Sequence, residues 1–545
     1  MTPIRLDAIV FGAYLFTVAL VGVLASRKEK GSDDYFLAGR KLVWWIIGGS
    51  LIAANISTHH FIGMGGQGFS KGLAIASYEW LAAIALILYA KFFLPYYLKS
   101  RITTMPEFLQ ARFDDKVRLV FACFSLIGYI FIELAVVLYT GSMAIETIFG
   151  LPLAWGLAIL CLIGGGYAIY GGFKAIAYTD LIQVTVLVLG GVTVTLLGLH
   201  KVGAALPEYG ASVWGGFRAV LAGAPEKFHM VMPWSDPELS WVGVFFGGLW
   251  LANIFYWGCN QFITQRTLAA KSVWHGQMGA VFAGFLKLLV PFLVVLPGII
   301  AFKLYNAETG LLKAQCVLSA GQADRAFPIL VKQLLPAGFT GLVMAGLMGC
   351  VMSHIASMLS ASSSIVTFDI YRHLFRKEAK SADLVRFGRL TAFAILVVAT
   401  AIGYFLRDLK AIFTYIQSGW SFFYPAICAV FLAGFFCPRA NARGALLALA
   451  LGPVWAAAFT AAEHARLLPW PAVPFLFRAG VDFVVCCLII WALRTRGDVP
   501  ASAVIDRTLP ADVAAQLAAI PWYKSFGFWG TLLVLSVIAL YIRFF

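Results

Sequence analysis

Long apolar stretches alternate with short polar segments along this chain of 545 residues. A helix needs about 20 mostly apolar residues to cross a bilayer. Fourteen stretches approach that length, at 7–26, 42–68, 74–98, 117–147, 153–171, 178–200, 239–263, 275–303, 326–372, 387–406, 410–436, 442–462, 473–494 and 526–544. The ninth, 326–372, is long enough for a short outer helix followed by a full span. The pattern predicts an all-α polytopic membrane protein with about 14 transmembrane helices.

Composition agrees with this pattern. Hydrophobic residues make up 61% of the chain and charged residues 12%, against roughly 25% charged in an ordinary soluble protein. The net charge of +15 arises from 41 Lys and Arg against 26 Asp and Glu, but the basic residues lie in short loops between apolar stretches. We therefore expect a lipid bilayer around the chain and no nucleic-acid partner. The nine Cys lack metal-ligand spacing, and we expect no cofactor.

The distribution of Lys and Arg predicts the orientation. Basic residues gather in the loops around 27–41, 91–118 and 372–389, whereas the loops between these are poor in them. Loops rich in Lys and Arg stay in the cytoplasm. We therefore predict that both termini are extracytoplasmic, that 201–238 and 304–325 are external, and that the protein lies in a plasma (inner) membrane.

Two of the expected spans are interrupted by polar and Gly residues, at 55–68 and at 251–261. Irregular backbone is tolerated at membrane depth only where it is buried in protein or lines a cavity. A close-packing small-residue face is the alternative for 55–68, and its G-x-G-x-x-G pattern follows no strand, which argues against a dinucleotide site. The interruptions lie five spans apart, as expected if five helices repeat in inverted order, so we predict a solute site between them.

Ionisable residues inside spans are costly and mark candidate sites. Glu79 and Lys287 are the clearest, and Asp180 lies near the end of its span. Lys287 is about twelve residues into its helix, which places it ~18 Å deep. Carboxylate, ammonium, amides and flat aromatic faces together suit a neutral polyhydroxylated ligand; a structural ion pair without ligand is the alternative. The amides are Asn55, Asn253 and Gln417, and the aromatic residues are Tyr78, Tyr256, Trp257 and Phe413.

Several motifs resemble those of the sodium:solute symporter family, most closely its sodium/sugar cotransporter branch. They are Asp34–Arg40, Ser50–Ser57, Ala76–Trp80, Thr104–Phe108, Tyr170–Asp180, Gln265–Arg266, Phe285–Leu288, Thr367–Tyr371 and Tyr415–Gln417. The resemblance implies a five-plus-five inverted-repeat fold like that of the sodium-coupled leucine transporters, working by alternating access. It places an extra helix and cytoplasmic loop at 1–41, the repeats at 42–200 and 239–436, and additional helices at 437–545.

The resemblance also implies which residues bind the solute. Sugar hydroxyls would contact Asn55, His60, Glu79, Asn253, Lys287 and Gln417. Gates would be Met64, Tyr78 and Phe413 on the outer side, and Tyr256 and Trp257 on the inner side. The expected function is symport of a small polar solute, such as glucose or galactose, with a cation. A uniporter, a membrane sugar sensor, or a symporter for inositol or an organic acid are alternatives. No H-E-x-x-H, G-x-S-x-G or Walker A motif suggests an enzyme.

The ion site departs from the family pattern. The resemblance places Na⁺ on carbonyls of Ala53 and Ile56 and on oxygens at Cys350, Ser353 and position 354, which is normally Ser or Thr; Asp180 would support a second ion site or relay a proton. Here position 354 is His, and imidazole is a poor ligand for Na⁺. One hypothesis is that His354 replaces the cation, so that transport is proton-coupled or sodium-independent. The alternative is that His354 points away and Ser353 with a water completes a weaker sodium site.

Overall fold

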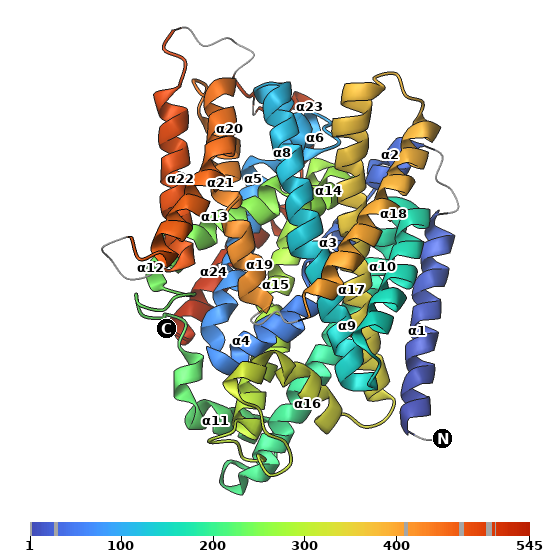
Figure 1. Cartoon of the computed structure of the whole chain (residues 1–545), viewed down its shortest axis with the longest axis vertical. Helices are drawn as coiled ribbons and strands as arrows, with labels where there is room; N and C mark the ends of the chain where they lie inside the picture. The colour runs from blue at the N-terminus through green and yellow to red at the C-terminus, as the bar shows by residue number, and fades with distance from the viewer. Residues whose placement is uncertain (1–2, 27–30, 408–411, 468–472, 498–503, 507) are drawn as a thin grey trace.

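The computed structural model describes residues 3–26, 31–407, 412–467, 473–497, 504–506 and 508–545 (Figure 1). They form a bundle of α-helices with only isolated backbone bridges between extended residues. The long helices are α1 (Pro3–Ser26), α3 (Trp44–Asn55), α5 (Ser77–Phe92), α8 (Asp115–Ile127), α9 (Ala135–Phe149), α10 (Leu153–Ala205), α15 (Val273–Tyr305), α17 (Phe339–Ser364), α18 (Ser381–Phe405), α19 (Ile412–Ser421), α20 (Tyr424–Phe436), α21 (Ala442–His464), α22 (Phe475–Ala492) and α24 (Phe526–Arg543). Shorter ones are α2 (Ser32–Leu37), α4 (Gly65–Ser70), α6 (Leu94–Lys99), α7 (Met105–Arg112), α11 (Val213–Gly223), α12 (Trp241–Phe245), α13 (Gly248–Ile254), α14 (Gln261–Leu268), α16 (Ala326–Leu334) and α23 (Ala511–Ala518).

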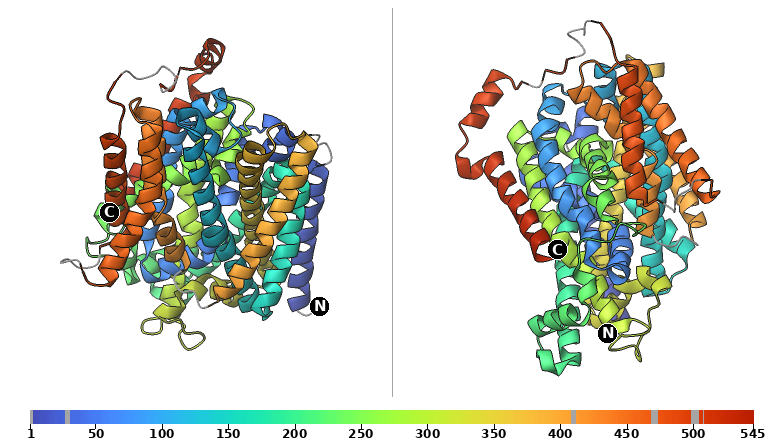
Figure 2. Two further views of the ribbon diagram at one scale, coloured as in Figure 1. Left: turned by 45° about the horizontal axis from the view of Figure 1, so that its top comes forward. Right: turned by 90° about the vertical axis from the view of Figure 1, so that its left-hand side faces the viewer.

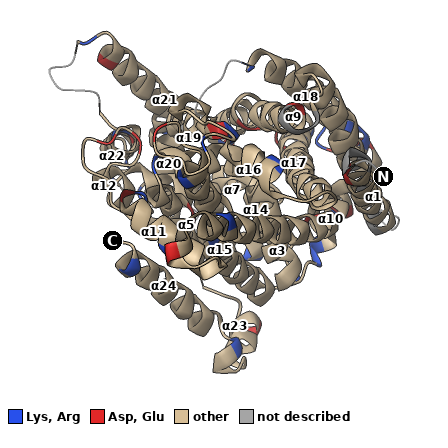
Figure 3. Cartoon of the chain, turned by 90° about the horizontal axis from the view of Figure 1, so that it is seen from below, with Lys and Arg blue, Asp and Glu red and all other residues tan. Residues whose placement is uncertain are grey.

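The number of spans agrees with the sequence prediction. Among the described residues, 12 helices are long and apolar enough to cross a membrane, and the pair α19 and α20, bent by 48°, makes up to 13. The segment α3 to α4 corresponds to the remaining expected span, which is divided into two short pieces. Seen along the long axis of Figure 1, the ribbon is largely free of charged residues (Figure 3). The prediction of an all-α polytopic membrane protein is confirmed.

The first broken helix is interrupted more briefly than expected. Only Ile56 and Ser57 leave the helical conformation, after which a π-helical segment, η2 (His60–Met64), leads into α4. Ile56 is extended, with ψ of 113°. The carbonyl group of Ala54, in the last turn before the break, accepts a hydrogen bond from Nδ1 of His354 at 2.9 Å. A backbone group released by the break thus has a partner, which is required at membrane depth.

The second broken helix is interrupted at one residue. The π-helical segment η7 (Phe255–Cys259) ends at Asn260, which is extended and begins α14. The Asn260 side chain accepts a hydrogen bond from Phe262 N at 3.1 Å, as an N-cap residue does, and another from Tyr129 OH at 2.5 Å. The predicted interruption at 251–261 is therefore present, and Asn260 explains why the helix restarts there.

The loop expected between 171 and 178 is absent, and this boundary prediction was wrong. Helix α10 runs through the region, interrupted only by Gly172 with φ of 60° and ψ of −174°. Before Gly172, Gly164 lies against Ile355; after it, Asp180 contacts Ser353 and Gly190 lies against Val343. After Gly172, residues further along α10 contact residues of α17 with lower numbers, so this part of α10 runs antiparallel to α17. The chain therefore reverses direction at Gly172. Glycine alone adopts these angles without strain, so it replaces a longer loop.

Segments predicted to share one side of the membrane lie together. Segments α11 and α16 and the N-terminus occupy the lower end of the molecule in Figure 1. Met230, in the expected external segment 201–238, donates through its N–H to the carbonyl of Phe544 near the C-terminus at 3.0 Å. Helix α24 lies on the flank of the bundle, where Leu533 packs against Gly284 of α15 (Figure 2). The arrangement agrees with the predicted alternation of sides; which side faces the cytoplasm stays a prediction.

Replacing Gly172 tests the reversal within α10. We expect Gly172→Ala to destabilise the protein by ~1–3 kcal/mol, because a Cβ strains this backbone conformation. The measurement is the midpoint of thermal unfolding of the purified protein in detergent. Gly166→Ala is the matched control, since Gly166 lies in the same helix with nothing within 4 Å of an added Cβ. Equal midpoints for both variants would contradict the assignment of a strained reversal at Gly172.

Candidate substrate and ion site

A cavity lies between the two broken helices. The cavity has a volume of about 70 Å³. At ~10–15 Å³ per water, this is room for roughly five to seven waters. That space suits one small polar molecule. The lining residues are Asn55, His59, His60, Tyr78, Glu79, Ala82, Glu133, Ala252, Asn253, Phe255, Tyr256, Trp257, Lys287, Phe413, Ile416, Gln417, Trp420 and Tyr424. All six residues predicted to bind substrate line it, together with four of the five predicted gates; Met64 is buried and is not among them.

Lys287 and Glu79 form a buried ion pair in the cavity wall. The Nζ atom of Lys287 lies 2.5 Å from Oε2 of Glu79 and also donates to Oδ1 of Asn55. It stands 5.2 Å from the centre of the Trp257 ring, a distance at which a cation is attracted by the ring. An ammonium group has three donors, so two are used. Burial of this pair is tolerated because each charge has a partner.

Amide and imidazole groups surround the pair. The Nδ2 atom of Asn55 donates to Tyr256 OH at 3.0 Å. The N–H of Ser57 donates to Nδ1 of His60 at 3.4 Å, so Nε2 carries the ring hydrogen; it lies 3.6 Å from Oε1 of Glu79. Asn253 donates to the carbonyl of Leu249 at 3.1 Å, which leaves its side-chain oxygen as an acceptor. The wall thus retains donors and acceptors for a hydroxylated ligand.

Aromatic rings complete the cavity. Tyr78 and Phe413 meet at right angles with centroids 5.1 Å apart, and Tyr256 and Trp257 meet edge-on at 5.2 Å. Both pairs have the edge-to-face geometry that aromatic rings favour. Their faces can cover the apolar C–H surface of a sugar ring while the polar groups bind its hydroxyls.

The residues of the expected ion site are close together, but most of their polar atoms already have partners. Ser353 donates to Oδ1 of Asp180 at 2.5 Å, and Ser50 donates to Oδ2. His354 does not point away from the helix break: Nδ1 donates to the carbonyl of Ala54, while Nε2 lies 3.5 Å from Oε2 of Glu133. Ala53, Ile56 and Cys350 are buried in the same region. The imidazole therefore lies where the resemblance places a cation ligand.

Asp180 and Arg266 form a second buried ion pair beside the ion site. Both side chains are fully buried, and NH2 of Arg266 lies 3.3 Å from Oδ2 of Asp180. Arg266 also donates to the carbonyls of Ser50 and Phe262 and to the hydroxyl of Ser357. One guanidinium thus joins α14, the second half of the second broken helix, to α3 and α17.

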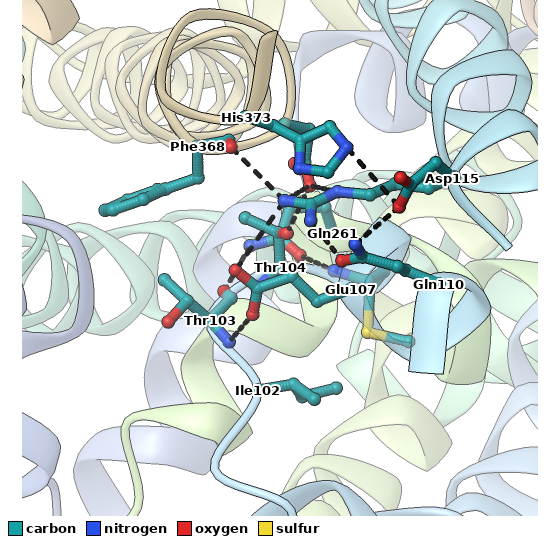
Figure 4. Close-up of polar contacts among 12 residues, drawn as sticks. Ile102, Thr103, Thr104, Glu107, Gln110, Asp115, Gln261, Phe368 and His373 are labelled. Carbon is teal, nitrogen blue, oxygen red and sulfur yellow. Dashed lines mark hydrogen bonds and ion pairs between the residues drawn. The ribbon is translucent and has the colours of Figure 1, made fainter. Parts of the chain in front are cut away.

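A polar cluster joins the second half of the second broken helix, α14, to its surroundings (Figure 4). Gln261, the first residue of α14, accepts from the N–H of Met105 at 2.7 Å and donates to the carbonyl of Thr103 at 3.2 Å. Nearby, Arg118 of α8 lies 2.6 Å from Oδ1 of Asp369, at the end of the long helix that begins with α17. These contacts hold together the end of the bundle that lies opposite α11 and α16 (Figure 1).

A polar chain lies at the opposite end. Thr414, next to Phe413, accepts from Gln67 of α4 at 3.1 Å and donates to Glu238 at 2.9 Å. Asp236 pairs with Lys71 at 2.7 Å. Partial burial alone would raise the pKa of Asp236, but hydrogen bonds from Lys71 and two backbone N–H groups lower it below its usual value. The second half of the first broken helix, α4, is thereby held to α19.

Sequence reasoning missed three residues of this region. Glu133 and Trp420 line the cavity, and Arg266 was recognised only as part of a motif. Glu133 could have been found, because it is an ionisable residue in the middle of an expected span, the criterion that identified Glu79 and Lys287. The partnership of Arg266 with Asp180 required the fold, since 86 residues separate them.

Comparison with known families identifies the chain. The profile of the sodium:solute symporter family matches residues 35–452. The chain belongs to the sodium:solute symporter family. Like its relatives it is a membrane symporter and not an enzyme.

Individual relatives in this family are sugar transporters by name. The chain is 44% identical over 455 residues to a sodium/glucose cotransporter of Vibrio parahaemolyticus, which covers 81% of this chain and 82% of the relative. It is 33% identical to sodium/glucose cotransporter 1 of Ovis aries, over 82% of this chain and 70% of that protein. It is 34% identical to sodium/myo-inositol cotransporter 2 of Sus scrofa, over 82% and 68%.

Solved structures confirm the fold. A Na⁺-coupled sialic acid symporter, solved in a substrate-bound outward-open state, superposes with a TM-score of 0.76 at 21% identity, over 89% of this chain and 96% of that one. A nucleobase-cation-symport-1 family transporter superposes with a TM-score of 0.52 at 11% identity, over 85% and 95%. At these identities the likeness concerns the fold alone, and it agrees with the expected leucine-transporter-like architecture of this symporter.

Removing one partner of the Asp180–Arg266 pair tests its structural role. We expect Asp180→Asn to reduce stability by ~3–5 kcal/mol, because it leaves a buried guanidinium without its counter-charge. The double variant Asp180→Asn, Arg266→Gln should recover part of the loss. Thermal unfolding in detergent measures both, with Asp512→Asn, an exposed position in α23, as the control. A double variant less stable than Asp180→Asn would contradict this account.

Proposed function

We propose that this symporter imports a neutral hexose, such as glucose or galactose, by alternating access and with Na⁺ as the coupling cation. The observation that carries the proposal is the single cavity lined by all six expected hydroxyl-binding residues, with the Glu79–Lys287 pair at its centre. The names of the relatives support both the sugar and the ion. We also propose the repeats 42–200 and 239–436, a plasma (inner) membrane location, and extracytoplasmic termini.

Each group in the cavity has a defined capacity toward a sugar. Glu79 accepts hydrogen bonds from hydroxyls, and Lys287 donates its remaining N–H to a hydroxyl oxygen. The side-chain oxygen of Asn253 and the amide of Gln417 can bond further hydroxyls, while Tyr78, Phe413 and Trp257 contact the ring. Na⁺ would be cargo at the break in the first helix, near the carbonyls of Ala53 and Ile56.

His354 supports a second candidate, in which this site holds no cation. Its Nδ1–H group donates to the carbonyl of Ala54 in the break, so an internal donor does part of what a bound ion would do. The comparisons lend no support to coupling with protons. This candidate therefore stands as sodium-independent transport.

Uptake into proteoliposomes tests the substrate. We expect labelled glucose or galactose to accumulate under an inward Na⁺ gradient and to be displaced by the unlabelled hexose. Sialic acid should compete poorly, because a buried carboxylate repels an anion. Glu79→Gln should lower kcat/KM at least tenfold, whereas Glu146→Gln, at an exposed position, should not. Preference for an organic anion, or binding without uptake, would contradict hexose symport.

Ion replacement tests the coupling. In the unaltered protein, uptake should rise when Na⁺ replaces K⁺ at constant pH. His354→Ser should then lower the Na⁺ concentration for half-maximal uptake, because it adds a hydroxyl oxygen, the ligand type that Na⁺ prefers. Uptake that is indifferent to Na⁺ in the unaltered protein and becomes Na⁺-dependent in His354→Ser would instead establish the second candidate.

A further inference from the structure

Glu133 is a second carboxylate in the cavity that the proposed function leaves without a role. It lies in the π-helical segment η4 (Gly128–Leu134) between α8 and α9, and the residue is 3% exposed. The wide turn of a π-helix is common at functional sites. Glu79 comes from α5 and is already paired with Lys287. The cavity therefore holds two acidic groups from different helices and one ammonium group.

The contacts of Glu133 hold its carboxylate in place and leave acceptor capacity free. Trp420, which also lines the cavity, donates through its indole N–H to Oε1 at 2.7 Å. Nε2 of His354 lies 3.5 Å from Oε2. Because Nδ1 carries the hydrogen that is donated to Ala54, this contact attracts the carboxylate only when Nε2 also carries a hydrogen. A carboxylate offers about four lone-pair positions, and these two contacts do not fill them. A buried carboxylate with spare acceptors that faces a polar cavity can accept a hydrogen bond from a ligand hydroxyl.

His354 connects this carboxylate to the helix break. Because a carbonyl oxygen only accepts, the contact of Nδ1 with Ala54 requires a hydrogen on Nδ1. The next residue, Asn55, lines the cavity and contacts both Lys287 and Tyr256. The His354 ring therefore spans from the wall that carries Asn55 to Glu133, and the Phe262 ring packs against it at a tilt, with the ring centroids 4.8 Å apart.

We propose that Glu133 contacts the substrate by accepting a hydrogen bond from a sugar hydroxyl, and that His354 is a positioning residue that holds this carboxylate toward the cavity. The inference rests on the proposed hexose function. It gives position 354 a role in sugar recognition that a Ser or Thr is too short to perform, and it is independent of whether the neighbouring carbonyls hold Na⁺.

A panel of singly deoxygenated hexoses tests Glu133. In the unaltered protein, removing one hydroxyl should raise the half-saturating concentration roughly tenfold, since a hydrogen bond to a charged group is lost. Glu133→Gln should raise the half-saturating concentration of the parent sugar by a similar factor. For the one deoxy sugar that lacks the hydroxyl bound by Glu133, the variant should cause no further increase. The other deoxy sugars should still show their full increase relative to the parent sugar. Such non-additivity identifies a direct contact. Glu79→Gln should show it at a different hydroxyl, and Glu146→Gln should behave as the unaltered protein.

The positioning role of His354 has its own readout. His354→Ala should weaken discrimination at the hydroxyl assigned to Glu133 without moving the half-saturating Na⁺ concentration, and His354→Gln, which keeps an N–H donor, should restore part of it. If Glu133→Gln does not fold, Glu133→Asp can be used instead. It keeps the charge but shortens the side chain by one methylene, and it should lose discrimination at the same single hydroxyl.

Each other outcome is decisive. Penalties that add for every deoxy sugar in the Glu133 variants would overturn the substrate contact. A His354→Ala protein with intact sugar discrimination would overturn the positioning role. If the unaltered protein neither binds nor transports any hexose, the proposed function falls and this inference falls with it; if it transports hexoses normally and only the variants fail to discriminate as expected, the inference alone is wrong.

Discussion

The structure depends on a fully buried ion pair between Asp180 and Arg266. Arg266 comes from α14, the second half of the second broken helix, and its hydrogen bonds reach the carbonyl of Ser50 in the first. A guanidinium has five donors. Those of Arg266 also reach the carbonyl of Phe262 and the hydroxyl of Ser357, while the neighbouring carboxylate balances the charge. The pair therefore ties the two broken helices to each other and to α17, and the cavity lies between the helices that it joins.

The cavity wall also contains a buried ion pair, and this pair faces the ligand. Lys287 is balanced by Glu79 and held by Asn55, so the charged groups are paired before any solute enters. Pairing keeps the burial cost low, and incomplete use of donors and acceptors leaves the site ready for hydroxyls. The polar cluster around Gln261 and the chain through Thr414 join the broken halves to opposite ends of the bundle, the ends that alternating access opens in turn.

Much of this could be predicted from the sequence because the bilayer imposes simple rules. Span lengths, the two interruptions, and Glu79 with Lys287 all follow from apolar runs and from what disturbs them. The amides Asn55, Asn253 and Gln417 were also found from the residues, and the resemblance supplied His60. The reversal at Gly172 was missed because a single residue replaces a loop and leaves no polar segment to detect. The partners of His354 were missed because Ala54 and Glu133 lie hundreds of residues away in the chain, and only packing brings them to the ring.

The reversal at Gly172 also bears on how the protein is made. With one residue between them, the spans 153–170 and 172–205 have no connecting segment that could wait in water while the second span emerges from the ribosome. We therefore expect the two spans to enter the membrane together as a hairpin, with the glycine setting the turn between them.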